Sequence, residues 1–363
     1  MLSALYVLLV YSLIVQFIIY LSYYFTKPTR LRRHINSKNK RLISVVVAVR
    51  NEEQNLITLI NALMNQNLKE DLYEVIIVDD YSNDSTFNQL ISIKDKFKNL
   101  KVLKNNYSQS KKNALKTGIE NSEGNIIALT DADCIPNANW LKSLSEVFDN
   151  DVDIVIGYSP IIPENKFLNK LARFENYTTS YLMTAFFKVG YPYMCFGRNL
   201  AYRKSLYENL RGFQGIEKSL SGDDDLFLQK AIKQNAKIFL NQVKESIVYT
   251  RFDQTFRQFI NQKTRHVSAS KYYIIKLKII LGIIYLSNIL LTFSIVPAIL
   301  YFDLFISSFW LLHMIIKILE VKNIQKLFEE TFNFILIPVL ETIYSFLLII
   351  FGILSRFKVV RWK

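Results

Sequence analysis

The stretch NIIALTDADCIP, at residues 125–136, joins an apolar run to two aspartates one residue apart and then to a proline. An apolar run of this length predicts a buried strand, and side chains two positions apart on an extended chain lie on the same side. Asp131 and Asp133 would then point the same way, as a pair of carboxylates that could bind a divalent cation. A solvated strand end would explain the same two residues, so their meaning depends on the rest of the chain.

The segments around this stretch alternate between strands and helices. The predicted strands cover residues 42–49, 74–80, 100–104, 125–131 and 153–158, and helical patterns follow at 53–65, after 85, at 111–120 and at 140–148. Such repetition predicts an α/β fold, a doubly wound and mostly parallel sheet with helices on both faces. Ligands of such sheets bind at the carboxyl ends of the strands.

Polar residues follow three of these predicted strands. They are Arg50, Asn51 and Glu52 after the first strand, Asp79, Asp80, Ser82 and Asp84 after the second, and Asp131 and Asp133 after the fourth. One acidic strand end is usually solvated, and Asp84 could simply cap the next helix. Three polar strand ends that meet at one edge indicate a ligand site.

Apolar residues gather at both ends of the chain. Of the 363 residues 50% are hydrophobic, and residues 2–25 carry no charge over the length of a membrane-spanning helix. No cleavage site follows, so we expect a retained anchor. Apolar runs also cover residues 279–302, 304–319 and 332–354. The second is short and contains His313 and Lys317, so it could be re-entrant or interfacial.

The charge pattern predicts the orientation. The net charge is +14, and residues 27–41 hold Lys and Arg without any acid. By the positive-inside rule this places the following domain in the cytoplasm, at the inner membrane. Nucleic acid is not expected as a partner, because many cations flank apolar segments, where anionic lipid attracts them, and no nucleic-acid module is present. If all three C-terminal runs cross the membrane, the basic C-terminal end lies outside, against the positive-inside rule. We therefore expect two or three membrane helices in the C-terminal region.

The predicted organisation has five parts. They are an anchor at 1–26, a basic linker at 27–41, a soluble domain at 42–275, a membrane region at 276–356 and a basic tail at 357–363. The two cysteines, Cys134 and Cys195, suit a reducing compartment and offer neither a disulfide framework nor zinc-ligand spacing.

The soluble domain resembles family-2 glycosyltransferases of the GT-A fold, whose nucleotide-binding half is Rossmann-like. The resemblance rests on seven segments in order: VVVAVRNEE, VDDYSNDST, QSKKNALKTGI, TDADCIP, GRNLAYRKS, SGDDDLFL and QKTRH. It implies transfer of a sugar from a nucleotide diphosphate sugar to an acceptor hydroxyl, with inversion at the anomeric carbon.

The resemblance gives roles to the donor-side residues. A Mg²⁺ or Mn²⁺ ion held by carboxylates would stabilise the diphosphate leaving group, with Asp133 as the first ligand and Asp131 at the metal or the ribose. The expected nucleotide-sugar contacts are Val49, Arg50, Asn51, Glu52, Asp79, Asp80, Lys111, Lys112, Asp131, Ala132, Gln262 and Arg265. Of the two strand-end aspartates, Asp80 is the better base contact. Solvated surface lysines would explain Lys111 and Lys112 equally, and a basic stripe along the membrane would explain Arg265.

An inverting displacement needs a general base, and SGDDDLFL offers one. Asp223, Asp224 and Asp225 open a predicted helix, where acids also complement the positive helix end. Crowding of like charges would raise the pKa of at least one of them, which suits a base. The resemblance favours Asp224 and leaves Asp223 in reserve.

The acceptor side is less defined. Arg198 and Asn199 are the expected acceptor-binding residues, and residues 164–190 form an aromatic stretch that is either a core face or an interfacial helix presenting a lipid-linked acceptor. His266 stands where processive synthases of the family carry tryptophan, which favours transfer of single sugars onto a lipid-linked or cell-surface glycan precursor. A processive polysaccharide synthase and a catalytically inactive membrane scaffold are the alternatives.

Overall fold

The computed structural model describes residues 2–24, 42–148, 151–217, 219, 221–328 and 330–357. The predicted basic linker at 27–41 and residues 358–363 of the predicted tail lie outside these ranges. The chain forms two compact units. The α/β unit contains Thr29–Ile162 and Tyr193–Asp253, and the membrane unit contains Met1–Pro28, Pro163–Pro192 and Gln254–Val360.

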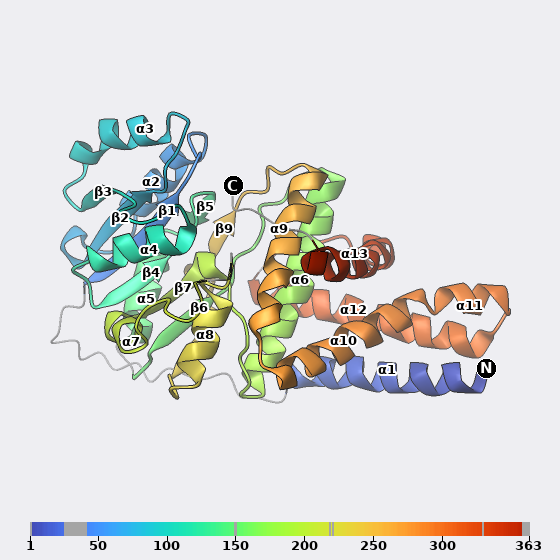
Figure 1. Ribbon diagram of the computed structural model, residues 1–363. Coiled ribbons are helices and arrows are strands. Elements are labelled where there is room, and N and C mark those ends of the chain that lie inside the picture. The colour runs from blue at the N-terminus through green and yellow to red at the C-terminus, as the bar shows by residue number, and fades with distance from the viewer. Residues whose placement is uncertain are drawn as a thin grey trace. The chain divides into compact units, whose positions relative to one another are not determined.

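The α/β unit is built on a seven-stranded sheet in the order β3-β2-β1-β4-β7-β6-β8 (Figure 1). Its strands are β1 (Ile43–Val49), β2 (Tyr73–Asp79), β3 (Leu100–Lys104), β4 (Ile126–Leu129), β6 (Ile154–Gly157), β7 (Leu200–Arg203) and β8 (Ile238–Asn241). All neighbouring strands pair in parallel except β7, which is antiparallel to both β4 and β6. The predicted mostly parallel, doubly wound sheet is confirmed.

The register of the central strands brings their carboxyl ends to one edge. Val49 at the end of β1 pairs with Asp79 at the end of β2. On the other side of β1, Val46 pairs with Leu129, the last residue of β4. The polar segments that follow these three strands therefore begin at the same edge of the sheet.

Helices cover both faces of this sheet, as is typical of parallel strands buried on both sides. They are α2 (Leu56–Met64), α3 (Thr86–Ile93), α4 (Lys111–Glu120), α5 (Trp140–Phe148), α7 (Lys204–Asn209) and α8 (Asp225–Ile232). Every residue of β1 is buried. Val45 and Val47 pack in one core cluster with Leu59 and Leu63 of α2. Helix α4 packs on the other face, where Gly118 lies directly against Val46.

The segment after β4 differs from the expected extended chain. The predicted strand reaches Asp131, whereas β4 ends at Leu129 and a turn precedes β5 (Cys134–Pro136). Strand β5 leaves the main sheet and pairs antiparallel with β9 (Val248–Thr250). The expectation that Asp131 and Asp133 share one side of a continuous strand is therefore wrong, because the chain turns between them to reach a second sheet.

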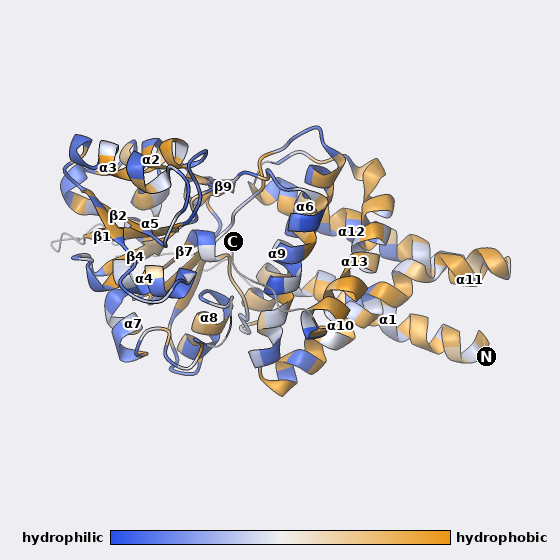
Figure 2. Cartoon of the chain, turned by 45° about the horizontal axis from the view of Figure 1, so that its top comes forward, coloured by the Kyte–Doolittle hydropathy of each residue, from blue (hydrophilic) through white to orange (hydrophobic). Residues whose placement is uncertain are grey.

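The membrane unit contains four described helical segments that are long and apolar enough to cross a membrane. They are α1 (Leu2–Ser22), the segment Ile275–Leu300 formed by α10 (Ile275–Phe293) and α11 (Ile295–Leu300), α12 (Leu304–Phe328), and Phe334–Phe357, most of which is α13 (Ile337–Phe357). Figure 2 shows apolar residues along α1, α10 and α11. The short run at 304–319 lies inside α12, whose 25 residues give it the length to cross.

Two helices of the predicted soluble domain belong instead to the membrane unit. These are α6 (Phe167–Lys188) and α9 (Phe256–Ser268). The aromatic face of α6 is buried within that unit: Tyr181 stacks on Tyr23 at 4.9 Å between ring centroids, and Phe174 meets Tyr344 edge-on at 6.2 Å. The soluble domain is therefore not one uninterrupted segment from 42 to 275.

We expect Gly118→Val to destabilise the protein, because a Cβ at this position would lie 2.4 Å from Cγ1 of Val46. Overpacking of this kind typically costs about 1–3 kcal/mol. The matched control is Gly282→Val in α10, where an added Cβ meets nothing within 4 Å. The measurement is the apparent melting temperature in detergent. Equal melting temperatures of the two variants would contradict the tight packing of α4 on β1.

Candidate active site

A single ammonium group joins two distant segments of the α/β unit. Nζ of Lys111, at the first residue of α4, lies 2.8 Å from Oδ1 of Asp131 and 3.1 Å from Oδ2 of Asp223. The helix start is fixed by Ser110, whose hydroxyl accepts a hydrogen bond from the backbone N–H of Asn113. Although burial acts to lower the pKa of Lys111, the carboxylates of Asp131 and Asp223 raise it, so the lysine stays charged.

The three consecutive acids at the start of α8 have different partners. Gly222 adopts a φ of +87°, which turns the chain into the helix. One oxygen of Asp224 accepts the backbone N–H of Asp225 at 2.7 Å, and the other accepts that of Gly197 at 3.2 Å. Asp225 accepts the N–H of Cys195 at 3.2 Å. Residues 195–197 therefore lie directly against the acidic turn, and glycine at 197 permits this approach.

The environments of Asp223 and Asp224 push their pKa values apart. Burial, and then the charge of Asp223, raise the pKa of Asp224 to about 6. Although burial also acts to raise the pKa of Asp223, Lys111 holds it below the usual range. Asp224 is half-buried whereas Asp223 is buried. A general base needs access and a pKa near neutrality, so of the two Asp224 is better suited.

Lys112 has a different environment from Lys111. Only 7% of Lys112 is exposed, and its Nζ donates to the backbone carbonyls of Ser221, at 2.9 Å, and Ser219. Burial lowers its pKa. This lysine ties the segment before Gly222 to α4, and its expected contact with a diphosphate stays a prediction.

The second polar strand end contains two buried aspartates with unused acceptor atoms. Asp79 is 4% exposed and Asp80 is 0% exposed. Oδ1 of Asp80 accepts from the Asn105 amide at 2.5 Å, and burial raises the Asp80 pKa. Oδ1 of Asp79 and Oδ2 of Asp80 have no hydrogen-bond partner among the described residues. Buried carboxylate oxygens without donors are suited to receive N–H or O–H groups of a ligand.

Asn105, which orients Asp80, was not among the sequence-predicted site residues. It follows β3, and its backbone N–H donates to the carbonyl of Asp79 at 2.9 Å. The available signal was a polar residue directly after a predicted strand.

The segment after β1 is bound to the segment after β2. Asn51 has a φ of +54°, its N–H donates to Ser82 Oγ at 3.0 Å, and its side-chain oxygen accepts the N–H of Asn83 at 2.8 Å. The N–H of Glu52 donates to Thr86 Oγ1 at 2.8 Å. The charge of Arg50 acts on Asp80 and opposes the rise of its pKa. Val49 is fully buried in β1, so its side chain serves the core.

The acidic pair after β4 fits a cation shared with a substrate. No group of three His, Cys, Asp or Glu side chains in the described ranges could hold a metal ion by itself. Mg²⁺ is commonly bound by one or two carboxylates, with waters and substrate phosphates completing its shell. Asp131 and Asp133 flank the buried Ala132 in the turn, and the Asp133 carbonyl accepts the N–H of Arg251 at 3.0 Å. The turn supplies the two carboxylates that such sharing requires.

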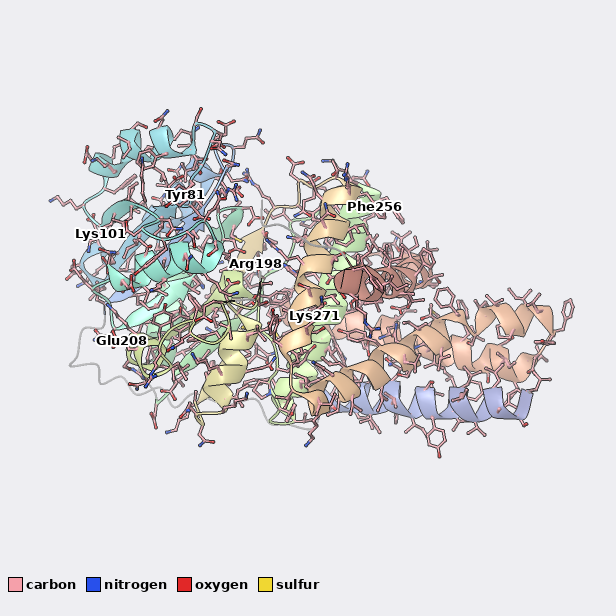
Figure 3. The ribbon with its side chains drawn as sticks, viewed as in Figure 1. Tyr81, Lys101, Arg198, Glu208, Phe256 and Lys271 are labelled. Carbon is pink, nitrogen blue, oxygen red and sulfur yellow. The ribbon has the colours of Figure 1, made fainter. Side chains whose placement is uncertain are left out.

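Arg198 and Asn199 form part of a short 3-10 turn, Gly197–Asn199. Arg198 (Figure 3) donates to the hydroxyl of Ser159 at 2.6 Å and to its carbonyl at 3.0 Å. The Asn199 amide donates to the carbonyls of Tyr158 and Ser246 and accepts from Trp140 Nε1 at 3.0 Å. Both ends of this amide are engaged inside the fold, and the expected acceptor contacts of Arg198 and Asn199 stay predictions.

Gln262 and Arg265 lie on α9 of the membrane unit. Their expected contacts with the donor diphosphate stay predictions.

Comparison with known proteins shows a likeness to glycosyl transferase family 2. Residues 44–211 match the model of glycosyl transferase family 2. This match covers a little under half of the chain. The chain is 35% identical to glycosyltransferase AglE of Haloferax volcanii over 116 residues, which is 32% of this chain and 38% of AglE. It is 26% identical to the probable glycosyltransferase YdaM of Bacillus subtilis over 252 residues, 66% of this chain and 58% of YdaM. The match thus spans less than two thirds of either relative.

A solved structure extends the likeness beyond the matched residues. The mannosyltransferase PcManGT from Pyrobaculum calidifontis, in complex with GDP-Man and Mn²⁺, aligns with a TM-score of 0.63 at 15% identity. The alignment covers 98% of this chain and 99% of that one. The GT-A-like fold with its membrane helices is therefore confirmed.

We expect Gly197→Ala to lower glycosyltransferase turnover about tenfold or more, because the new Cβ would lie 2.9 Å from Oδ2 of Asp224 and displace the carboxylate. The measurement is nucleotide release from a nucleotide sugar, made in the wild type and in an Asp224→Asn background. Because both changes act on one carboxylate, the glycine substitution should cost little more in that background. If instead the two substitutions lower turnover by independent factors that multiply, Gly197 acts on something other than the Asp224 carboxylate.

Proposed function

We propose that this protein transfers a single sugar from a nucleotide diphosphate sugar to an acceptor hydroxyl by metal-assisted single displacement, with inversion at the anomeric carbon. The observation that supports this most is the grouping around Lys111. Its ammonium binds Asp131 next to the candidate cation ligand Asp133, and it binds Asp223 next to the candidate base Asp224. Charge stabilisation and proton acceptance, the two needs of such a reaction, would then meet in one place.

The nucleoside half of the donor would bind at the ends of β1 and β2. The unpaired buried oxygens of Asp79 and Asp80 are acceptors for ribose hydroxyls and base N–H groups. The Asn105 amide binds Oδ1 of Asp80, which leaves Oδ2 of Asp80 to accept a hydrogen bond from the ligand. The GDP-Man bound by PcManGT supports a nucleotide sugar as the donor class.

Asp133 and Asp131 would hold a Mg²⁺ or Mn²⁺ ion. When bound, such an ion neutralises the negative charge that develops on the diphosphate as it leaves. Lys111 adds a fixed positive charge beside Asp131, in a partly buried position where charge interactions are stronger than in water. The Mn²⁺ in PcManGT supports a divalent cation in this role.

Asp224 would act as the general base. Its carboxylate takes the proton of the acceptor hydroxyl while the acceptor oxygen forms a bond to the anomeric carbon. The bond from that carbon to the diphosphate oxygen breaks, and the nucleoside diphosphate departs with the electron pair. Asp223, kept ionised by Lys111, raises the basicity of its neighbour through its charge.

The acceptor would be a lipid-linked or cell-surface glycan precursor at the inner membrane. Four helices with the length and composition of membrane spans support a membrane-borne acceptor. The basic run at 27–41 supports a cytoplasmic position of the α/β unit. His266, in the place of a stacking tryptophan, supports transfer of one sugar rather than polymerisation, and Arg198 is the best placed acceptor contact.

We expect Asp133→Ala and Asp224→Asn to fail in different ways. The measurement is metal-dependent release of nucleoside diphosphate from a panel of nucleotide sugars, together with metal-dependent nucleotide binding. Asp133→Ala should abolish the binding, whereas Asp224→Asn should leave it within about twofold and lower turnover about 10²–10⁴-fold. Near-normal activity of both variants would refute these roles, and no turnover of any nucleotide sugar by the wild type would refute the function.

We expect turnover to rise with pH along a limb with an apparent pKa of about 6, because Asp224 accepts a proton only when it is ionised. Below that pH the carboxyl is protonated and activity falls about tenfold per pH unit. The measurement is the pH profile of kcat/KM between pH 5 and 8 at saturating metal. The residual activity of Asp224→Asn should lack this limb, and its persistence there would assign the titration to another group.

A further inference from the structure

The membrane unit contains a cavity of about 40 Å³ that is lined by both polar and apolar side chains. Five helices contribute to it: α1, α6, α10, α12 and α13. Its polar lining includes Gln16, Thr178, Tyr181, Asn288, Lys317, Glu320 and Glu341, and Ile19, Leu182 and Leu348 supply apolar wall. At roughly 10–15 Å³ per water-sized group, it has room for about three hydroxyls or waters. Ionisable residues inside a membrane segment are costly and generally serve a function.

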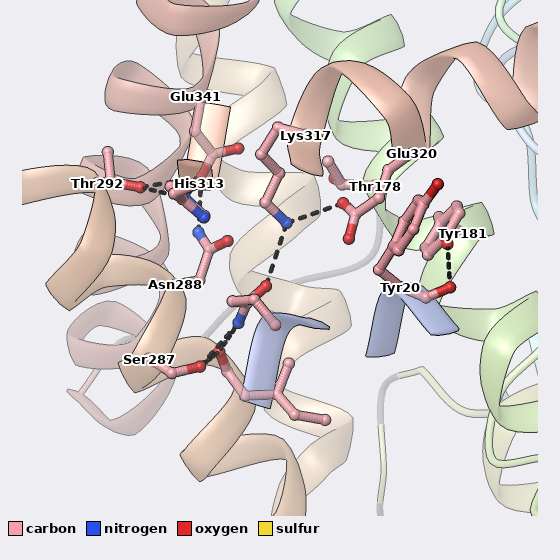
Figure 4. Close-up of polar contacts among 12 residues, drawn as sticks. Tyr20, Thr178, Tyr181, Ser287, Asn288, Thr292, His313, Lys317, Glu320 and Glu341 are labelled. Atoms are coloured by element: carbon pink, nitrogen blue, oxygen red, sulfur yellow. Dashed lines mark hydrogen bonds and ion pairs between the residues drawn. The ribbon is translucent and has the colours of Figure 1, made fainter. Parts of the chain in front are cut away.

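One side of the cavity is formed by an ion pair (Figure 4). Nζ of Lys317 lies 2.9 Å from Oε2 of Glu320 and 3.4 Å from Oε1 of Gln16. The Gln16 amide in turn donates to Ser287 Oγ at 2.7 Å. Lys317 is thus neutralised by a carboxylate on its own helix and held by α1.

The other side is formed by Glu341, which is 0% exposed. Its Oε1 accepts hydrogen bonds from Asn288 at 2.6 Å, from Ser345 at 2.9 Å and from Thr292 at 3.2 Å. Its other oxygen, Oε2, has no partner among the described residues, and neither has Oε1 of Glu320. Two buried carboxylates that line one cavity therefore each leave one acceptor atom unused.

The charges of the lining decide which ligand fits. The one ammonium in the lining, that of Lys317, is already held by Glu320 and Gln16, so the lining offers a phosphate group no unpaired cation. A metal ion is not favoured either, since no set of three ligands occurs in the described part of the chain. The unused atoms are acceptors, so the complementary ligand donates hydrogen bonds. Uncharged hydroxyl groups meet these conditions, and the apolar wall suits the start of an acyl chain.

The place of the cavity within the membrane unit suits a lipid head group. Gln16 lies six residues before the end of α1 at Ser22, which is about 9 Å along the helix. The amphipathic helix α6, which is no membrane-span candidate, closes the cavity through Thr178 and Tyr181. The cavity thus lies toward the end of α1 that α6 covers, where head groups meet the hydrocarbon.

We propose that this cavity binds the uncharged head of a membrane lipid that carries two hydroxyls, such as the glycerol head of a monoacylglycerol. Glu341 and Glu320 each accept one hydroxyl hydrogen bond, and the acyl chain leaves past the apolar wall. The proposal goes beyond the transfer reaction, since it concerns a second binding site in the membrane unit and holds whichever sugar is moved.

The test is titration of the full-length protein in detergent with monooleoylglycerol and, separately, with monooleoyl lysophosphatidic acid, with bound lipid measured by native mass spectrometry. The wild type should bind monooleoylglycerol at least about tenfold more tightly than lysophosphatidic acid. Glu341→Gln and Glu320→Gln should each weaken monooleoylglycerol binding about tenfold, because each replaces a carboxyl acceptor by an amide. The matched control is Thr342→Val, since the Thr342 hydroxyl bonds only within its helix, to the Pro338 carbonyl, and should leave binding unchanged.

Three results would overturn the proposal: equal or tighter binding of lysophosphatidic acid, unchanged monooleoylglycerol binding in both glutamate variants, and no lipid binding, which would make the cavity a water site. Nucleotide release from a nucleotide sugar, measured without lipid, checks that each variant is folded. It also separates the two proposals. If the wild type releases no nucleotide, the proposed transfer reaction fails, and the lipid titration can still be interpreted.

Discussion

The site depends on the charge of one lysine. Asp131, Asp223 and Asp224 carry three carboxylates in a partly buried region, where like charges repel strongly. The Lys111 ammonium contacts two of them and lets Asp223 remain ionised. Asp224, which Lys111 does not contact, feels the charge of Asp223 and binds its proton more tightly. One cation thus keeps the acids together and gives adjacent aspartates opposite pKa shifts.

The position of this lysine follows from the sheet. Strands β1, β2 and β4 are continuous apolar runs, and their parallel pairing and shared edge were predictable from the sequence. Strands β5, β7, β8 and β9, of three or four residues each, were not predicted. Side-chain partners were also beyond prediction. The sequence could not show that Lys112 binds carbonyls while Lys111 binds carboxylates, since adjacent residues on a helix point about 100° apart.

The membrane unit shows a similar division. The apolar stripe of α6 was evident, but a stripe does not reveal whether it packs on a soluble core or on membrane helices, because both are apolar. His313 and Lys317 made the run at 304–319 a weak candidate span. Their partners, Thr292 for His313 and Gln16 and Glu320 for Lys317, explain how a helix can bury such groups. Two of these three partners lie on other helices, so the sequence of α12 alone did not show how its polar groups are paired.

The order of the chain has a practical consequence. Between β6 and β7 the polypeptide leaves the α/β unit, forms α6 within the membrane unit and returns. Any continuous fragment that keeps the whole seven-stranded sheet must therefore include α6. Without α1 and α13, the faces of Tyr181 and Phe174 would be exposed to water, and such surfaces promote aggregation. A soluble version of the α/β unit would need a short linker in place of residues 163–192, so this unit is separable by redesign and not by truncation.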